Sequence, residues 1–250
     1  MNFDHPAFAP YQALIQALIL ADARPSLETL NQQAEQHGIL QAHGLPIRFV
    51  SPQNRLSARE YECSVLQTGE VPTRPDTWHD VLNALVWLRF PRFKSALNQA
   101  HGQAIALETK SRRGRRRDAM TMLDESGVWV ISQDTALPQL LHERAWQSLF
   151  WEQRSNVEST LHFVVVGHAL LEKALTPYLS MTGKCLMVMS QSLDPDRAES
   201  VATHALKQIA SPLQLAPLPI QGIPGWDTAN AQAEYYANTR IFRPLNPAGS

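Results

Sequence analysis

Two histidines stand near carboxylates at spacings that suit acid–base or metal chemistry. His168 and Glu172 are four residues apart, so a helix places both side chains on one face. His79 and Asp80 follow Thr77 at the expected start of another helix, where free N–H groups lower the proton affinity of an imidazole. A neutral imidazole beside a carboxylate can bind a divalent metal or move a proton. All four are therefore candidate catalytic residues, and His168 and Glu172 are also candidate metal ligands.

A second group of carboxylates lies between these histidines in the sequence. Asp118, Asp124 and Glu125 fall within eight residues, and paired carboxylates can hold Mg²⁺ or act as a general acid and base. We add Asp124 and Glu125 to the candidate catalytic residues. Structural interpretations stay open, because acidic residues are common in turns and a histidine on an apolar stripe is often a core residue with one hydrogen bond.

Positive charge is concentrated in one segment. Six of the 22 Lys and Arg residues stand within 110–117, whereas the whole chain carries 23 Asp and Glu. Such a cluster cannot be buried without partners, because each unpaired ion is expensive to desolvate. Guanidinium groups match phosphate oxygens, so two interpretations stay open: a loop that binds an anionic group, or a solvated loop whose arginines pair with nearby acids. The candidate anion-binding residues are Arg112, Arg113, Arg115, Arg116 and Arg117.

The composition is that of a folded cytoplasmic protein. The 250 residues are 44% hydrophobic and 18% charged. A pI near 6.8 argues against a protein that coats nucleic acid, so an anionic small molecule is the favoured partner. Cys63 and Cys185 form neither a disulfide framework nor a metal-binding spacing. Because a secretory signal and a long apolar stretch are both missing, we expect no membrane partner; the subunit number stays open.

The elements that position these side chains follow from hydrophobic periodicity. Helices are expected at 11–22, from Ser26 to about Gly38, from Thr77 to Pro91, from Pro91 to Gly102 and from Asp194 to Ala210. Short strands are expected at 47–50, 61–66 and 184–189. Two apolar runs flank Asp-Glu-Ser-Gly, which predicts a β-hairpin over 119–131 with Gly127 at positive φ.

The second half of the chain is harder to assign. Residues 135–175 fit a mostly helical stripe, although the run 163–166 also suits a strand; we favour the helix. The last 40 residues are rich in proline but also in aromatic residues, which predicts an ordered, irregular C-terminal strap. The expected fold is α+β, predominantly helical, a single domain over residues 1–250 with a small antiparallel sheet that includes the hairpin.

Several strings resemble one known family. They are Trp78-His79-Asp80 with Asn83-Ala84-Leu85 and Phe90-Pro91-Arg92, Arg117-Asp118-Ala119 with Leu123-Asp124-Glu125-Ser126-Gly127, Gly167-His168-Ala169-Leu170-Leu171-Glu172-Lys173, and Gly222-Ile223-Pro224-Gly225-Trp226 with Arg240-Ile241-Phe242-Arg243-Pro244. Together they are similar to an uncharacterised bacterial family, the domain of unknown function 3025. The resemblance covers about residues 45–245, which favours one folding unit, and it implies no particular activity.

Three classes of function stay open. In the first, an enzyme gathers the candidate catalytic residues in one cleft, with Arg116 and Arg117 on the anionic group of a substrate, and performs hydrolysis or another acid–base reaction. A divalent metal, if used, would bind His168 and a carboxylate. In the second, a binding module contacts RNA or an acidic protein through the arginines. A scaffold whose strap crosses to another subunit is a third alternative. The enzyme hypothesis requires His79, Asp124 and His168 to lie within about 10 Å of one another.

Overall fold

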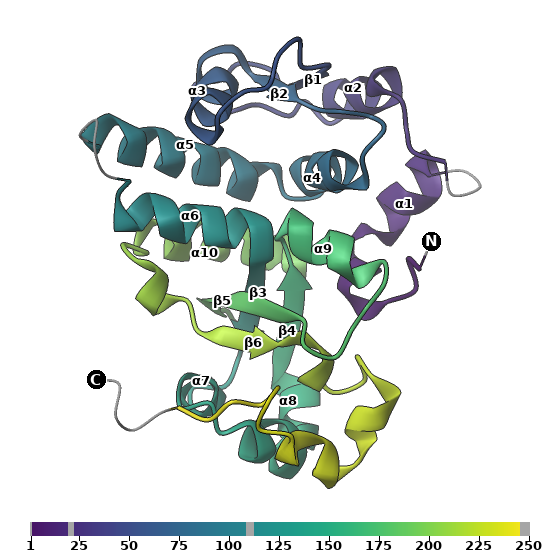
Figure 1. Ribbon diagram of the computed structural model, residues 1–250, viewed down its shortest axis with the longest axis vertical. Helices are drawn as coiled ribbons and strands as arrows, with labels where there is room; N and C mark the ends of the chain where they lie inside the picture. The colour runs from purple at the N-terminus through teal and green to yellow at the C-terminus, as the bar shows by residue number, and fades with distance from the viewer. Residues whose placement is uncertain (1, 20–22, 109–112, 246–250) are drawn as a thin grey trace.

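A four-stranded mixed sheet forms the centre of the molecule (Figure 1). The computed structural model describes residues 2–19, 23–108 and 113–245. The strand order is β4 (Leu161–Val165), β3 (Gly127–Ser132), β5 (Thr182–Met189) and β6 (Pro217–Pro219). β3 pairs antiparallel with β4 and parallel with β5, and β5 pairs antiparallel with β6. Every residue of β3 is buried, as expected for a strand covered on both faces.

Most helices lie on one side of this sheet (Figure 1). They are α4 (Trp78–Arg89), α5 (Pro91–Leu107), α6 (Arg115–Ser126), α9 (His168–Ala174) and α10 (Pro195–Lys207). Beyond them lie α2 (Leu27–Gln36), α3 (Ala58–Thr68) and a parallel pair of short strands, β1 (Arg48–Val50) and β2 (Glu70–Pro72). The N-terminal segment, a 3-10 turn (Pro6–Tyr11) and α1 (Gln12–Leu18), packs along the edge of this layer.

The opposite side of the sheet carries shorter elements (Figure 1). These are α7 (Leu137–His142), a π-helical turn (Ser148–Glu152), α8 (Arg154–Thr160) and 3-10 turns at Ile220–Gly222, Thr228–Ala231 and Ala233–Ala237. A further 3-10 turn, Pro212–Gln214, connects α10 to β6. The predicted strap covers the last 40 residues, of which 246–250 lie outside the described part of the chain. Residues 220–245, called the C-terminal strap below, are ordered and irregular, as predicted. Tyr236 and Phe242 are buried with ring centroids 5.1 Å apart, and the indole of Trp146 donates to the carbonyl oxygen of Arg243 at 3.0 Å.

The starts of α4 and α5 follow from the local sequence. The Thr77 hydroxyl accepts from the Asp80 N–H and caps α4, while Pro91 begins α5 after the buried corner residue Phe90. The predicted stop at Gly102 is wrong, because α5 continues to Leu107. A Cβ on Gly102 would lie 2.4 Å from a methyl carbon of Leu66, so this glycine lets α3 pack closely against α5.

The predicted hairpin over 119–131 is wrong. Residues 115–126 form α6, and Ala119, Met120 and Leu123 are its buried face at helical spacing. Asp-Glu-Ser is therefore the last turn of a helix, and only the second apolar run is a strand. Gly127 has φ −65°, not a positive value. A glycine is needed there because a Cβ would lie 2.3 Å from the carbonyl oxygen of Leu123.

Two other assignments are wrong for similar reasons. Residues 61–66 belong to α3, which Ser57 and Glu60 begin with a reciprocal capping box. Residues 161–165 are strand β4 rather than part of a long helix, because a strand buried on both faces shows no alternation that separates it from a helix. The sheet is accordingly mixed, not antiparallel. The strands expected near 47–50 and 184–189 and the helices that begin near Ser26 and Pro195 are confirmed.

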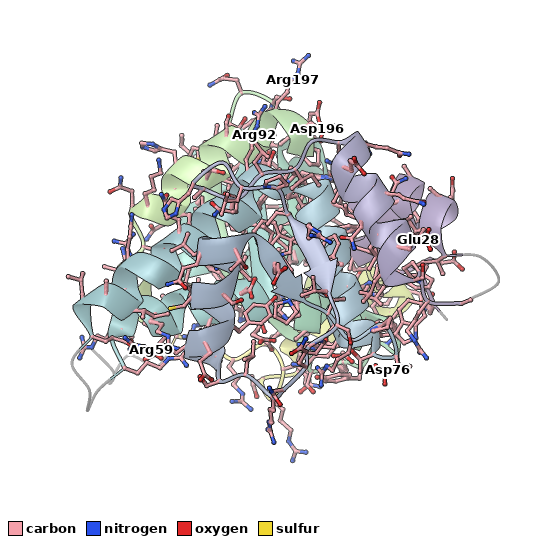
Figure 2. The ribbon with its side chains drawn as sticks, turned by 90° about the horizontal axis from the view of Figure 1, so that it is seen from above. Glu28, Arg59, Asp76, Arg92, Asp196 and Arg197 are labelled. Carbon is pink, nitrogen blue, oxygen red and sulfur yellow. The ribbon has the colours of Figure 1, made fainter. Side chains whose placement is uncertain are left out.

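The fold class is confirmed as α+β and mostly helical. The buried apolar side chains form one cluster that includes both Phe3 and Phe242. Exposed charged residues such as Glu28, Arg59 and Arg197 point toward the periphery when the molecule is viewed from above (Figure 2). Within the described residues, no helix has the length and hydrophobicity needed to cross a membrane.

Candidate metal centre

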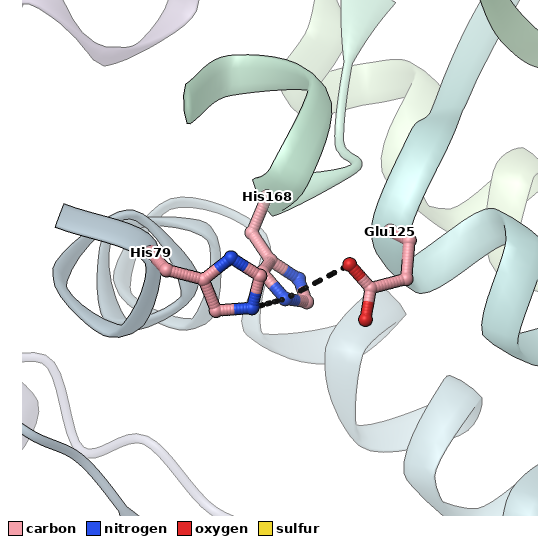
Figure 3. Close-up of side chains that lie close together, drawn as sticks. All are labelled: His79, Glu125 and His168. Carbon is pink, nitrogen blue, oxygen red and sulfur yellow. Dashed lines mark hydrogen bonds and ion pairs between the residues drawn. The ribbon is translucent and has the colours of Figure 1, made fainter. Parts of the chain in front are cut away.

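Three helices bring two imidazoles and a carboxylate together (Figure 3). His79 lies in the first turn of α4, Glu125 in the last turn of α6, and His168 is the first residue of α9. The two Nε2 atoms of His79 and His168 are 3.0 Å apart, and Nε2 of His168 is 3.6 Å from Oε2 of Glu125. One potential ligand atom from each of the three residues lies within 4.8 Å of the others.

Two glycines make this convergence sterically allowed. β4 ends at Val165, and the chain turns through Gly167 into α9 directly against the end of α6. A Cβ on Gly167 would lie 2.4 Å from the backbone nitrogen of Gly127 and 2.5 Å from Cα of Ser126. The N–H groups of Val166 and Gly167 both donate to the carbonyl oxygen of Gly127 at 2.9 Å. This close approach at Gly167 places His168 beside the carboxylates of α6.

The outer nitrogens of the two rings face carboxylates. Nδ1 of His79 is 2.9 Å from Oε2 of Glu172. Because an ionised carboxylate can only accept, the proton is on Nδ1, which donates a hydrogen bond to Glu172. Nδ1 of His168 lies 3.9 Å from Oδ2 of Asp124. In its neutral form His79 therefore presents an unprotonated Nε2 to the shared space. A neutral His168 then carries its proton on Nε2, which donates to Nε2 of His79 at 3.0 Å, while Nδ1 of His168 is too far from Asp124 for a hydrogen bond. At His79, the carboxylate on Nδ1 and the free Nε2 form the arrangement that metal-binding histidines use.

Burial keeps His168 neutral. Desolvation lowers the pKa of His168 to about 4, and the positive charges of Lys94 and His79 act in the same direction, against the attraction of Asp124. Burial alone would raise the pKa of Asp124, but the Lys94 ammonium and His168 outweigh it and lower the pKa to about 2. The ionised Asp124 and Lys94 form a nearly buried ion pair, with side chains 14% and 5% exposed.

The cluster is open to solvent on one side. The side chains of Glu125 and Glu172 are 42% and 44% exposed, and that of His79 is 33% exposed. Burial and the negative charge of Asp124 raise the pKa of Glu125. A solvent-borne ion or small molecule can therefore reach the imidazoles from the glutamate side, while Lys94 and Asp124 close the opposite side.

A buried polar network lies behind Asp124. The Lys94 ammonium also donates to Oδ1 of Asn83, at 2.8 Å, and Nδ2 of Asn83 donates to the hydroxyl of Tyr61 at 2.9 Å. Deeper between α3 and α5, Nδ2 of Asn98 donates to Oε2 of Glu62 at 2.7 Å, and Nε2 of His101 is 3.7 Å from Oε1 of the same carboxylate.

Burial perturbs two members of this network strongly. It raises the pKa of Glu62 to about 7, with the charge of Asp124 adding to the effect. It lowers the pKa of His101 to about 4, against the attraction of Asp124.

The other candidate residues fall outside the cluster. Both carboxylate oxygens of Asp80 are bound by the Arg74 guanidinium, at 2.8 and 3.0 Å. The arginines 115–117 form the first turn of α6, so Arg117 and Asp124 are about 10 Å apart along the helix axis. Arg113 pairs with Asp118 at 2.6 Å, and the buried Arg117 pairs with Glu108 at 3.0 Å.

The arginine segment is thus not a continuous loop at the rim of the site. Arg112 lies outside the described residues, whereas Arg115 is exposed and Arg116 half-buried.

Sequence reasoning missed the groups that surround Asp124. Lys94, Asn98 and His101 stand at i, i+4 and i+7 of α5, one polar stripe beside an apolar stripe. Polar residues that keep helical register with an apolar face are a detectable signal of a buried network. Asn83 shows the same signal four residues after His79 on α4.

Comparison with known proteins identifies the family of this chain but gives no activity for it. No curated protein and no solved structure matches the chain. One family model, described as "Protein of unknown function (DUF3025)", matches residues 47–246, which include all the residues of the cluster. The chain is therefore a member of the DUF3025 family.

Proposed function

We propose that this protein is an enzyme that holds a divalent transition metal on His79, His168 and Glu125 and hydrolyses an anionic small molecule. The observation that carries the proposal is the pair of Nε2 atoms 3.0 Å apart with a carboxylate oxygen beside them. Two facing nitrogen lone pairs and an anionic oxygen repel one another unless a proton or a cation lies between them.

The distances support a metal in that position. Metal–nitrogen bonds of about 2.1 Å place two imidazole nitrogens roughly 3.0–3.4 Å apart for bond angles between about 90° and 109°. Two histidines and one carboxylate, with positions left for water and substrate, make a ligand set used for catalytic Zn²⁺ and Fe²⁺. Mg²⁺ is a poorer match, since it prefers oxygen ligands.

The surrounding carboxylates support the same assignment. Glu172 accepts from Nδ1 of His79, and Asp124 faces Nδ1 of His168. In the proposed site these two residues orient the rings and keep protons off Nε2, which is how outer carboxylates act on metal-binding histidines. Glu125 thereby takes the ligand role that the sequence alone suggested for Glu172.

In the proposed reaction, the metal and the side chains of the protein have different roles. A bound divalent metal supplies Lewis acidity and a coordinated water that ionises near neutral pH. Glu125, half-exposed on the open side, would be a ligand of that metal and would leave the remaining coordination positions to water and substrate. The anionic group of the substrate is attracted by the metal, because the arginine segment lies at the other end of α6. We place this reaction in the cytoplasm, which suits the free thiols of Cys63 and Cys185.

The alternative, a binding module that uses the arginines, gains less support. Arg113 and Arg117 are already paired with acids of the same chain, and Arg117 is buried. Neither is free to bind RNA or an acidic protein without breaking an existing ion pair.

The test measures hydrolysis by protein that has been stripped with EDTA and reloaded with Zn²⁺, Fe²⁺ or Mn²⁺. The substrates are p-nitrophenyl phosphate, bis-p-nitrophenyl phosphate and p-nitrophenyl succinate. We expect activity only with metal, loss of activity in His168→Gln, and a decrease of about 10- to 100-fold in Glu172→Gln. The neighbouring exposed substitution Lys173→Gln is the control and should leave the rate unchanged. Equal rates for the loaded parent protein and His168→Gln on every ester would overturn the proposal.

A further inference from the structure

A basic groove lies on the side of the sheet opposite the metal centre. It encloses about 350 Å³ between the β5–β6 end of the sheet, the segment after α7 and the C-terminal strap. Figure 1 shows the strap and α7 below the sheet, whereas α4, α6 and α9 lie above it. We call this cavity the strap groove; it shares no residue with the His79–His168–Glu125 cluster.

The floor of the groove is one face of two paired strands. Thr182 pairs with Pro219 and Lys184 with Pro217, and side chains of paired residues point to the same face. Two of the three residues of β6 are prolines, which have no N–H to offer to a further strand. The edge is therefore poorly suited to adding an extended peptide, which favours a small molecule over a protein segment as the ligand.

Hydrogen bonds fix the walls of the groove. The indole N–H of Trp146 donates to the carbonyl oxygen of Arg243 at 3.0 Å, and Nε of Arg243 donates to the carbonyl oxygen of Arg240 at 3.1 Å. These bonds hold the strap against the body of the protein, and Arg144, Arg240 and Arg243 all line the same cavity. The strap thus closes the groove with two guanidinium groups.

The charge of the groove is the observation that points to a ligand. Among the described residues, its lining includes Arg144, Lys184, Arg240 and Arg243 but no carboxylate. None of these four forms an ion pair with an acid in the described part of the chain, whereas Arg113 and Arg117 both do. Four like charges gathered in one cavity of a nearly neutral protein repel one another unless an anion binds between them.

We propose that the strap groove binds a small molecule that carries a diphosphate group on an apolar body. A diphosphate has about as many negative charges as the groove has cations, and guanidinium groups bind phosphate oxygens bidentately. Trp146, Ile241 and the two prolines supply apolar contacts. The volume falls in the range of small-ligand sites, about 300–1,000 Å³. This site is separate from the proposed hydrolase and does not depend on its metal.

Isothermal titration calorimetry on EDTA-stripped protein tests the proposal with three probes: ADP, sodium pyrophosphate and adenosine. We expect one ADP per chain, weaker binding of pyrophosphate and no binding of adenosine. The double variant Lys184→Gln/Arg240→Gln should weaken ADP binding at least about tenfold, because it removes two charge-assisted contacts. The single variant Arg144→Gln tests the segment after α7 in the same way.

The matched control removes two exposed charges elsewhere. Arg48→Gln/Arg197→Gln has the same net charge as the test variant and should bind ADP within about twofold of the parent protein. Melting temperatures confirm that each variant is folded. The proposal is overturned if neither phosphate probe shows saturable binding up to about 5 mM, or if the control loses as much affinity as the two groove variants.

Discussion

The chemistry of the metal centre depends on where single protons sit. His79 keeps its proton on the Glu172 side, and the neutral His168 has one proton to place between His79 and Asp124. Moving that proton to Nδ1 frees both Nε2 atoms at once. Asp124 can stabilise it there only because Lys94 keeps the carboxylate ionised inside the protein.

Lys94→Met should therefore destabilise the protein strongly. It leaves Asp124 buried without a partner, a change that costs about 3–5 kcal/mol for buried ion pairs. The free energy of unfolding in urea at pH 7 measures this loss, and Lys173→Met on the exposed face of α9 is the control. In the parent protein, ionised Asp124 stabilises the folded state because its pKa is lowered from 3.8 to about 2. This stabilisation is present above pH 4 and is lost as the pH falls through 3.8 toward 2. A loss no larger than that of the control would contradict the role given to Lys94.

The buried His101, a base rather than an acid, also makes the stability of the protein depend on pH. Its pKa is about 4 in the folded protein and 6.5 for a model imidazole, so the unfolded chain binds more protons between these values. Its contribution to stability is therefore complete above pH 6.5 and falls by about 3 kcal/mol as the pH drops to 4. Between pH 4 and 6.5, the free energy of unfolding should change more steeply with pH in the parent protein than in His101→Leu. Parallel curves would show that His101 does not titrate as its burial implies.

At the scale of elements, the site depends on how β4 turns into α9 against the end of α6. The sequence allowed His168 and Glu172 to be placed on one helical face. It did not reveal that His79, 89 residues away, lies between His168 and Glu172. Local spacing carries no information about contacts of that separation. The failed hairpin has a related cause, since two short apolar runs suit either two strands or a helix followed by a strand.

Gly167→Ala tests this turn. Its Cβ would meet backbone atoms of Ser126 and Gly127 at 2.4–2.5 Å, which neither helix can relieve by a side-chain rotation. We expect a loss of about 2 kcal/mol or more in the free energy of unfolding and weaker metal binding, because α9 must move away from α6. Gly114→Ala at the start of α6 is the control: its Cβ has no neighbour closer than 3.9 Å. Equal stability of the two variants would contradict the proposed packing.

At the scale of the whole molecule, the strap joins the two ends of the chain into one core. Its aromatic content predicted order, and the structure confirms that Tyr236 and Phe242 are buried. The positive charge was misjudged at this scale. The sequence drew attention to the run at 110–117, whereas the groove collects Arg144, Lys184, Arg240 and Arg243 from three separate segments. Charges that are dispersed in sequence can be grouped only once the path of the strap is known.

Phe242→Ala tests the structural role of the strap. The ring is 3% exposed and packs against Tyr235 and Tyr236, so its removal should lower the free energy of unfolding by about 3–5 kcal/mol. Leu245→Ala, at a position 53% exposed, should have little effect. Chemical denaturation provides the comparison, and a stable Phe242→Ala variant would mean that the strap is not part of the core.

The most direct test of the metal centre is a titration of EDTA-stripped protein with Zn²⁺, together with the zinc content of each variant after dialysis. The account predicts one tightly bound Zn²⁺ per chain in the parent protein and in His204→Ala, an exposed histidine on α10. It predicts that His79→Ala and His168→Ala each lose at least about 100-fold in affinity, because each removes a ligand. Zinc that is absent from the parent protein, or retained equally by the His168→Ala variant, would contradict it.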